Sequence, residues 1–226
     1  MQLLLHAAAV ALVAFCTPRT AAQPTLVTTL AGSATAGSSF ADGLGTSALF
    51  NSPMYDLAVD ASGNVVVSDY LNNRIRLIAP NRTVTTLAGS STGITSPGLG
   101  VNVTEPTGLA ISASTSQIYF TSDHSFSIFQ LSPATGFVST LNIAQGATFL
   151  VPRSLALDSL GNLLVVDAGH NMIRSIALNT GIVTTLAGNG STGHTDGPAL
   201  NATFNSPFGI TITCTSLNLV TTPFAS

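Results

Sequence analysis

The chain lacks lysine and tryptophan and carries little charge of either sign. Charged residues make up 7% of its 226 residues, its six basic residues are all arginine, and the formal net charge is −3. A protein that binds nucleic acid needs clustered cations to replace the counterions condensed on the phosphates. No such cluster is present, so the composition argues against a nucleic-acid partner.

Cysteine and the common catalytic motifs are also scarce. Of the two cysteines, Cys16 lies in the apolar N-terminal segment, which leaves Cys214 alone in the rest of the chain. A single cysteine cannot form an internal disulfide, so we expect a buried thiol, with an intermolecular bridge as the alternative. Glu105 is the only glutamate, and no nucleophile elbow, phosphate loop or dinucleotide fingerprint occurs. The sequence therefore predicts no catalytic residues and no cofactor.

The first 22 residues have the features of a secretory signal peptide. The run Leu3–Phe15 is apolar but too short for a comfortable transmembrane helix, and Thr20–Ala22 supplies small residues for cleavage before Gln23. We therefore expect a signal peptide at 1–22, a secreted domain at 23–226, and no membrane contact after cleavage. The residues before the apolar run include no Lys or Arg, which departs from the usual signal peptide, so an uncleaved signal anchor that tethers the protein to a membrane is the alternative.

An internal repeat organises the remainder. Val-Thr-Thr-Leu-Ala-Gly begins at Val27, Val84 and Val183, and a degraded copy begins at Val138. Within residues 53–89, four short runs rich in Val, Ile, Leu and Thr are separated by Gly- and Asn-containing turns. Such runs are typical of a four-stranded antiparallel meander, which needs neighbours of its own kind to bury its faces.

Two further copies of this unit follow. Residues 152–176 repeat the first unit nearly position for position, and residues 106–131 form a looser copy. The recurring motifs are Asn-Ser-Pro at 51 and 205, Leu-Ala-Val-Asp followed by Gly-Asn, a strand-end Asp, and Asn-Arg-Ile-Arg. These motifs resemble the NHL repeat, the four-stranded blade of a β-propeller. The resemblance implies an all-β fold with blades at Asp56–Ala88, Thr107–Leu141 and Ser154–Ala187.

The sequence after the third unit is incomplete. Pro207–Thr213 begins a fourth unit, and Leu217–Thr222 supplies a second strand for it. A six-bladed ring needs about six repeats of roughly 45 residues each, so we expect a truncated member of the family, with a strained four-bladed ring or an open form as alternatives. Leu26–Ala31 is expected to close the fourth blade as its outer strand.

Histidines are the candidate metal ligands. NHL-type amidating lyases hold zinc with histidines from different blades, and on that resemblance His124, His170 and Tyr70 would meet in the channel. His124 and His170 occupy different places in their units, however, and no His-x-Glu or His-x3-His pattern supports a site. We therefore expect no metal.

Acidic and basic residues recur at the end of the second strand and the start of the third. A strand-end Asp precedes an Arg by five or seven residues across a tight turn, and can pair with it or with turn amides. Because the pattern repeats, we expect a structural role for Asp69, Arg74, Arg76, Asp167 and Arg174.

Four Asn-x-Ser/Thr sequons are candidate glycosylation sites in an exported protein. They are Asn81, Asn102, Asn189 and Asn201.

These features predict a propeller that binds a protein or glycan ligand through its inter-blade loops and performs no catalysis. The loops are Ser33–Asn51, Ser90–Glu105 and Asn189–Asn205, which are long and rich in Gly, Ser and Thr. The alternatives are an enzyme of the amidating-lyase or lactonase kind with a channel metal, and a truncated fragment without function.

Overall fold

The structure is a computed structural model that describes residues 28–33, 39–53, 55–89, 103–123, 125–144 and 146–212. Within these residues the chain forms β-strands and three single-turn 3-10 helices, at Gly45–Ser47, Tyr70–Asn72 and Ala168–His170. The strands are β1 (Gly43–Leu44), β2 (Leu57–Val59), β3 (Val65–Asp69), β4 (Arg74–Ile78), β5 (Thr83–Gly89), β6 (Pro106–Ile111), β7 (Ile118–Ser122), β8 (Ile128–Ser132), β9 (Phe137–Thr140), β10 (Pro152–Leu157), β11 (Asn162–Asp167), β12 (Met172–Ala177) and β13 (Ile182–Ala187).

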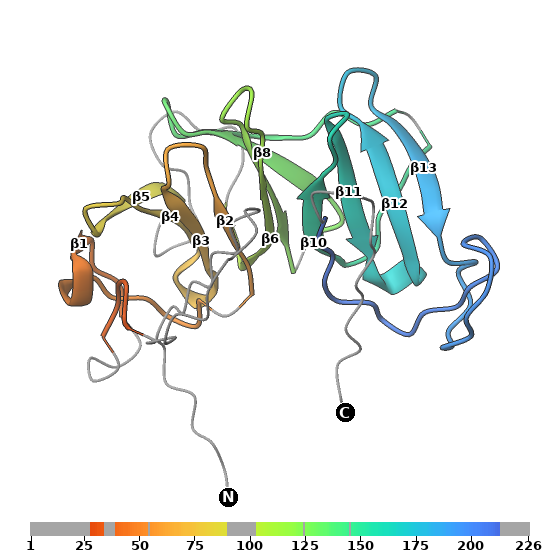
Figure 1. Ribbon diagram of the computed structural model, residues 1–226, viewed down its shortest axis with the longest axis horizontal. Helices are drawn as coiled ribbons and strands as arrows, with labels where there is room; N and C mark the ends of the chain where they lie inside the picture. The colour runs from red at the N-terminus through yellow and green to blue at the C-terminus, as the bar shows by residue number, and fades with distance from the viewer. Residues whose placement is uncertain are drawn as a thin grey trace, which may run out of the picture.

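The strands form three antiparallel sheets that stand side by side (Figure 1). The sheet orders are β1-β5-β4-β3-β2, β6-β7-β8-β9 and β10-β11-β12-β13. The first strand of each unit is innermost, and β6 lies beside both β2 and β10. Each four-stranded meander is a propeller blade, so the prediction of an all-β, incomplete propeller with three full blades is confirmed.

Each inner strand begins in the same backbone conformation. The residue before the recurring proline has a positive φ in all four units: Ser52 (54°), Glu105 (40°), Val151 (51°) and Ser206 (47°). Left-handed conformations are costly for residues with a Cβ. Two of the four are held by a side chain from the preceding blade: the side-chain oxygens of Asn73 and Asn171 accept the N–H groups of Glu105 and Ser206 at 2.8 Å.

The end of the second strand fixes the connection that enters its own blade. The Asp69 carboxylate accepts the N–H of Asn51, and the Asp167 carboxylate accepts the N–H of Leu150, both at 2.8 Å. Asn51 and Leu150 each lie two residues before the proline of their unit. The second blade has Ser122 at this position instead of Asp. The repeated strand-end polar residue therefore positions the start of each inner strand.

The core lies between successive sheets. One apolar cluster joins the first and second blades through residues that include Val66, Ile75 and Phe120. A second joins the second and third blades through residues that include Phe149 and Leu163. Two further clusters cover the outer faces of the first and third blades, so non-blade segments bury the two end faces of the stack.

The N-terminal segment packs differently from our expectation. Residues 28–33 lie against the first blade, where the Arg82 side chain donates to the carbonyl oxygens of Thr29 and Leu30, both at 2.9 Å. Ala31 is fully buried in the apolar cluster of that blade. For these residues the prediction that Leu26–Ala31 closes the fourth blade is wrong, because Leu30 and Ala31 pack on the apolar face of the first blade.

The connection Ser33–Asn51 also differs from the expected free loop. In its described part, residues 39–51, Gly43 and Leu44 pair with Val84 and Thr83 of β5. This pairing adds a fifth strand to the first sheet and covers an edge that would otherwise expose unpaired backbone groups. The backbone at Gly43 and Leu44 is therefore part of the first sheet, and the prediction that this connection contacts a partner stays a prediction.

Several predictions fall on residues outside the described ranges. They include the signal peptide 1–22, residues 90–102 of the predicted loop Ser90–Glu105 with the sequon at Asn102, His124, Cys214 and Leu217–Thr222. Within the described ranges, no helix is long and apolar enough to cross a membrane.

Candidate functional site

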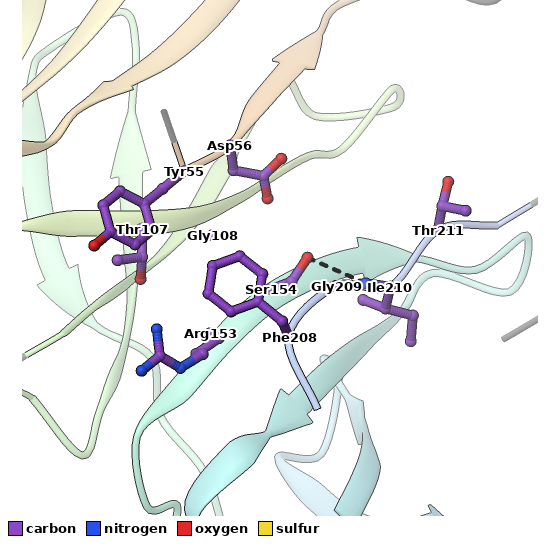
Figure 2. Close-up of a pocket in the computed structure, with 10 residues that line it drawn as sticks. All are labelled: Tyr55, Asp56, Thr107, Gly108, Arg153, Ser154, Phe208, Gly209, Ile210 and Thr211. Carbon is purple, nitrogen blue, oxygen red and sulfur yellow. Dashed lines mark hydrogen bonds between the residues drawn. The ribbon is translucent and has the colours of Figure 1, made fainter. Parts of the chain in front are cut away.

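A cavity of about 270 Å³ lies where the inner strands begin (Figure 2). Two consecutive residues from each of the four units line it, together with two residues that follow in the fourth unit. The lining residues are Tyr55 and Asp56, Thr107 and Gly108, Arg153 and Ser154, and Phe208, Gly209, Ile210 and Thr211.

The cavity-lining pairs occupy one repeated position and differ in every unit. Before each pair stands the proline of the unit, and after it stands Leu57, Leu109, Leu155 or Ile210. Between these constant positions the sequence reads Tyr-Asp, Thr-Gly, Arg-Ser and Phe-Gly. The first unit reaches this register with one extra residue after its proline. The scaffold positions therefore repeat, whereas the residues that face the cavity do not.

Hydroxyl groups of the second strands hold the inner strands in place. The Ser68 hydroxyl donates to the carbonyl oxygen of Thr107 at 2.6 Å, and the Thr121 hydroxyl donates to that of Arg153 at 2.7 Å. Each bond joins one blade to the inner strand of the next. Gly108 permits the closest approach, because a Cβ there would lie 2.1 Å from the Arg153 carbonyl oxygen. The wall of the cavity is thus set by inter-blade hydrogen bonds.

Asp56 links the first two inner strands at the cavity wall. Its Oδ1 accepts the N–H of Leu57 and its Oδ2 accepts the N–H of Leu109, both at 2.9 Å. Burial raises the pKa of Asp56 to about 7, although the two amide donors act in the opposite direction. The carboxyl group therefore titrates near neutral pH, at a position where it accepts hydrogen bonds from the first and second blades.

Aromatic rings connect the first and fourth units. The rings of Tyr55 and Phe208 lie 6.3 Å apart, and Tyr55 packs on Tyr70 at 4.4 Å. The Tyr70 hydroxyl lies 3.2 Å from both Glu105 Oε2 and Asp123 Oδ2. Burial, followed by the negative charge of Asp123, raises the pKa of Tyr70, so the phenol stays protonated and donates to these carboxylates.

Among the described residues that line the cavity, Arg153 is the one cation. Its guanidinium lies 5.1 Å from the centroid of the Phe208 ring, and Nη1 lies 3.7 Å from Asp123 Oδ1. Figure 2 shows the Phe208 ring between the Arg153 side chain and Ser154, whose hydroxyl oxygen accepts the N–H of Ile210 at 3.4 Å. The site thus combines aromatic surface, one arginine, one titrating carboxyl group and hydroxyls.

The recurring Asp/Arg residues lie away from the cavity. Asp69 and Arg76 are both fully buried and form an ion pair of 2.7 Å. Arg174 lies 3.2 Å from Asp167. In both pairs the Arg lies seven positions after the Asp. Arg74, five positions after Asp69, instead donates to the Asn72 carbonyl oxygen at 2.7 Å and lies 3.6 Å over the Phe40 ring.

The histidines do not converge in the described part of the chain. His170 Nδ1 lies 2.9 Å from Asp167 Oδ2, beside the second strand of the third blade. His194 lines a separate hollow of about 170 Å³ within the connection 188–206. No group of three or more His, Cys, Asp or Glu residues suited to a metal occurs among the described residues.

Three of the four sequons are described, and all three lie on the surface. Asn81, Asn189 and Asn201 are exposed. The Asn81 and Asn189 side chains accept N–H groups two residues later in their turns. Glycosylation at these positions remains a prediction.

The residues that line the cavity were not predicted from the sequence. The candidate residues came from recurring motifs, and these pairs are the positions that do not recur. An alignment of the four units on their prolines and on the following Leu or Ile would have located the variable pair. Glu105 and Asp123 are neighbours because they extend the pairing of β6 with β7, in which Pro106 faces Ser122. No pattern in the sequence indicated that Tyr70 of the first blade would reach both of them.

No protein-family model matches the chain, and no curated protein sequence matches it. Among solved structures, an auxiliary nutrient binding protein from Bacteroides ovatus matches with 18% identity, over 74% of this chain and 38% of that one, at a TM-score of 0.53. A protein of the same description from Bacteroides thetaiotaomicron matches with 17% identity, over 68% and 41%, at 0.52. Virginiamycin B lyase from Staphylococcus aureus matches with 15% identity, over 69% and 44%, at 0.46.

The chain therefore spans about two fifths of the length of the two nutrient binding proteins. At these identities the likeness concerns the fold alone. These neighbours are β-propeller proteins, and the chain has the fold of that class.

Proposed function

We propose that this propeller is a binding module that holds a small polar ligand, or the end of a glycan or peptide chain, in the cavity where the inner strands begin. The observation that carries this proposal is the concentration of sequence differences at the two cavity-lining positions of each unit. A position that only builds the blade has the same requirement in every unit, as the proline and the following Leu or Ile have. The first residue of each pair, which is Tyr, Thr, Arg or Phe, has no such shared requirement, whereas the second also holds neighbouring strands.

The composition of the wall supports this role. Ligand sites are concave, mostly apolar, and carry a few placed polar groups. Here Tyr55, Phe208 and Ile210 supply apolar surface, and Asp56 and Arg153 supply charge. A volume of about 270 Å³ lies at the small end of the range for ligand pockets, about 300–1,000 Å³. The site therefore suits a single small molecule or the terminus of a chain.

Methyl NMR on the full chain tests this proposal. Protein with labelled isoleucine methyl groups is titrated with a chemically diverse set of small polar compounds. Ile210 reports on the cavity, whereas Ile78, fully buried in the first blade, serves as the internal reference. We expect some compounds to shift the Ile210 signal and not the Ile78 signal, and Phe208→Ala to abolish that shift. If no compound moves Ile210 selectively, the cavity is not a ligand site.

An enzyme is the second candidate, and Asp56 is the observation in its favour. A group with a pKa of about 7 is suited to general acid or base catalysis near neutral pH. The measurement is proton release from a panel of lactones, followed with a pH indicator. Turnover that Asp56→Asn removes would make this candidate the better one. Equal rates in both proteins and in buffer would rule out this use of Asp56.

A further inference from the structure

Arg153 has hydrogen-bonding capacity that the described residues do not use. The other four arginines of this part of the chain each donate at least one hydrogen bond, for example Arg82 to two carbonyl oxygens and Arg174 to Thr148. For Arg153 no hydrogen bond to a described residue is present, and its Nε is buried without an acceptor, as are those of Arg76 and Arg174. A guanidinium has five N–H donors, so Arg153 presents unmet donors at the wall of a cavity.

The charged residue beside Arg153 is Asp123, which does not itself line the cavity and whose Oδ1 accepts no hydrogen bond from a described residue. Asp123 Oδ1 lies 3.7 Å from Arg153 Nη1, which is too far for a direct hydrogen bond. Both side chains are partly exposed, at 25% for Arg153 and 20% for Asp123. A hydroxyl oxygen can accept from an N–H group at about 2.9 Å and donate to a carboxylate at about 2.7 Å. These two lengths form a triangle on a base of 3.7 Å, so one hydroxyl group can serve both side chains.

The charges near Arg153 favour one kind of ligand group over the others. A ligand carboxylate would approach Arg153 but would also meet Asp123 and Glu105, which lie on either side of the Tyr70 hydroxyl. A ligand ammonium group would suit these carboxylates but would leave the donors of Arg153 unmet and would face its positive charge. A neutral hydroxyl group meets both requirements, because it donates and accepts.

The aromatic residues favour a ligand with an apolar face. Phe208 and Tyr55 line the same cavity as Arg153, and their rings lie 6.3 Å apart. Aromatic side chains bury apolar surface against a ligand at low conformational cost. A sugar ring combines an apolar face with neutral hydroxyl groups, since its C–H groups form the face and its hydroxyl groups lie at the edge.

We propose that the ligand of this cavity is a neutral pyranose, free or at the end of a glycan, with one hydroxyl group bridging Arg153 and Asp123 and with its apolar face against Phe208 and Tyr55. This inference rests on the proposed binding function and narrows its ligand to one chemical class.

Calorimetric titration of the full chain tests the inference, with the methyl pyranosides of glucose, galactose and mannose as probes. The matched acid and amine are methyl glucuronide and glucosamine. We expect at least one neutral pyranoside to bind at least tenfold more tightly than the acid and the amine. Arg153→Gln and Asp123→Asn should each weaken its binding about tenfold or more. The charge-matched controls Arg82→Gln and Asp196→Asn, which lie outside the cavity, should leave its Kd unchanged.

A second measurement keeps the test independent of folding defects. Deoxy analogues of the pyranoside that binds, each lacking one hydroxyl, are titrated into the wild type and Asp123→Asn. For the analogue that lacks the bridging hydroxyl, Asp123→Asn should cause no further loss.

Three results would overturn the inference. The first is tighter binding of the acid. The second is pyranoside binding that Arg153→Gln leaves intact. The third is the absence of pyranoside binding while non-sugar compounds still shift Ile210, in which case the binding function stands and the sugar assignment fails. If no compound of any kind shifts Ile210, the binding function itself fails.

Discussion

Arginine side chains of this chain differ in burial, and the difference decides what each contributes. Arg76 is fully buried and bonds to Asp69, Asp42 and the carbonyl oxygens of Ala41 and Leu49. Through these bonds one side chain joins the third strand of the first blade to the segment that covers its edge. Arg174, the equivalent residue of the third blade, is 16% exposed and bonds to fewer partners.

Replacing Arg76 should therefore cost more than replacing Arg174. Arg76→Met leaves Asp69 buried without its ion pair, and we expect a loss of about 3–5 kcal/mol in the free energy of unfolding. Arg174→Met should cost about 1.5–3 kcal/mol, the usual range for hydrogen bonds to charged groups. Urea denaturation measures both. The double variant Asp69→Leu/Arg76→Met should recover part of the loss, and equal costs at the two sites would contradict this account.

Asp56 should make stability depend on pH in the acid-to-neutral range. Its pKa is raised from 3.8 to about 7 in the folded protein, so the folded state binds the proton more tightly than the unfolded chain. The resulting stabilisation is complete below about pH 4 and is lost as the pH rises through 7. It amounts to at most about 4 kcal/mol, because a difference of one in pKa corresponds to about 1.36 kcal/mol.

Unfolding measurements on the wild type and Asp56→Asn between pH 4 and 8 test this expectation. The free energy of unfolding of the wild type should fall relative to that of the variant as the pH rises. Parallel curves would show that Asp56 titrates as an ordinary exposed carboxyl group. Comparing slopes avoids the separate cost of replacing a carboxylate oxygen that accepts the Leu57 or Leu109 N–H with an amide nitrogen.

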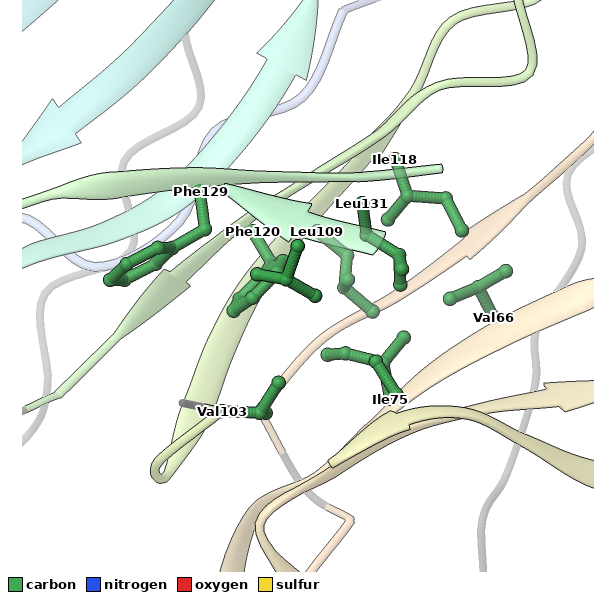
Figure 3. Packing of buried hydrophobic residues seen from close by; sticks show 10 residues of the cluster. Val66, Ile75, Val103, Leu109, Ile118, Phe120, Phe129 and Leu131 are labelled. Carbon is green, nitrogen blue, oxygen red and sulfur yellow. The ribbon is translucent and has the colours of Figure 1, made fainter. Parts of the chain in front are cut away.

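At the scale of elements, the outer strands of the first and third blades end in a close backbone approach to the start of the third strand of their own blade. The core between the first two blades is filled by side chains from both sheets (Figure 3). At the end of β5, Gly89 has a φ of +98°, and a Cβ there would lie 2.0 Å from the Asn73 carbonyl oxygen. Gly188 repeats this geometry after β13, with a Cβ at 2.4 Å from the Asn171 carbonyl oxygen. The glycine of the repeated Val-Thr-Thr-Leu-Ala-Gly is thus required by both conformation and space.

Alanine at these positions should cost more than at a glycine with open surroundings. Gly161 has a φ of +82°, and no atom lies within 4 Å of the place that a Cβ would occupy. Gly161→Ala therefore carries only the conformational cost, about 1–2 kcal/mol. We expect Gly89→Ala and Gly188→Ala to lower the free energy of unfolding by more than this, because the backbone must also move to make room for the Cβ. Thermal or urea unfolding of the three variants measures these losses of stability. Similar losses in all three would show that the close backbone contact at Gly89 and Gly188 adds no cost beyond that of the backbone conformation.

At the scale of the whole molecule, the stack of blades is covered at both ends by segments that are not complete blades. Phe50 and Ala31 cover the first blade, and Ile210 packs on Leu164 and Ile173 of the third. In stacked repeat proteins each unit contacts only its neighbours, and end units need a cover.

Each covering segment should stabilise mainly the blade on which it packs. Phe50→Ala and Ile210→Ala remove buried side chains, and each should cost about 2–5 kcal/mol. We expect faster hydrogen exchange mainly in β2–β5 for the first variant and in β10–β13 for the second, measured by mass spectrometry of peptides. Equal acceleration in all three sheets would show that the molecule opens only as a whole.

The sequence predicted the blades because their requirements repeat along the chain. Each unit needs a proline before its inner strand and alternating apolar residues, and the first and third units share a strand-end Asp, an Asn in the left-handed conformation and a final glycine. The placement of residues 28–33 and 39–51 was not predictable in this way, since it depends on which blade has an unpaired edge. The cavity was not predictable either, because Tyr55, Arg153 and Phe208 meet only after the units are stacked.

The two cavity-lining positions of each unit are adjacent in sequence and flanked by residues that fix the strand. Single substitutions at Tyr55, Arg153 and Phe208 would therefore alter what the cavity recognises, and would leave in place the two hydrogen bonds of Asp56 and the close approach at Gly108. A gene of this kind can thus change its ligand through substitutions at a few codons, and a protein engineer can vary those codons as a compact library.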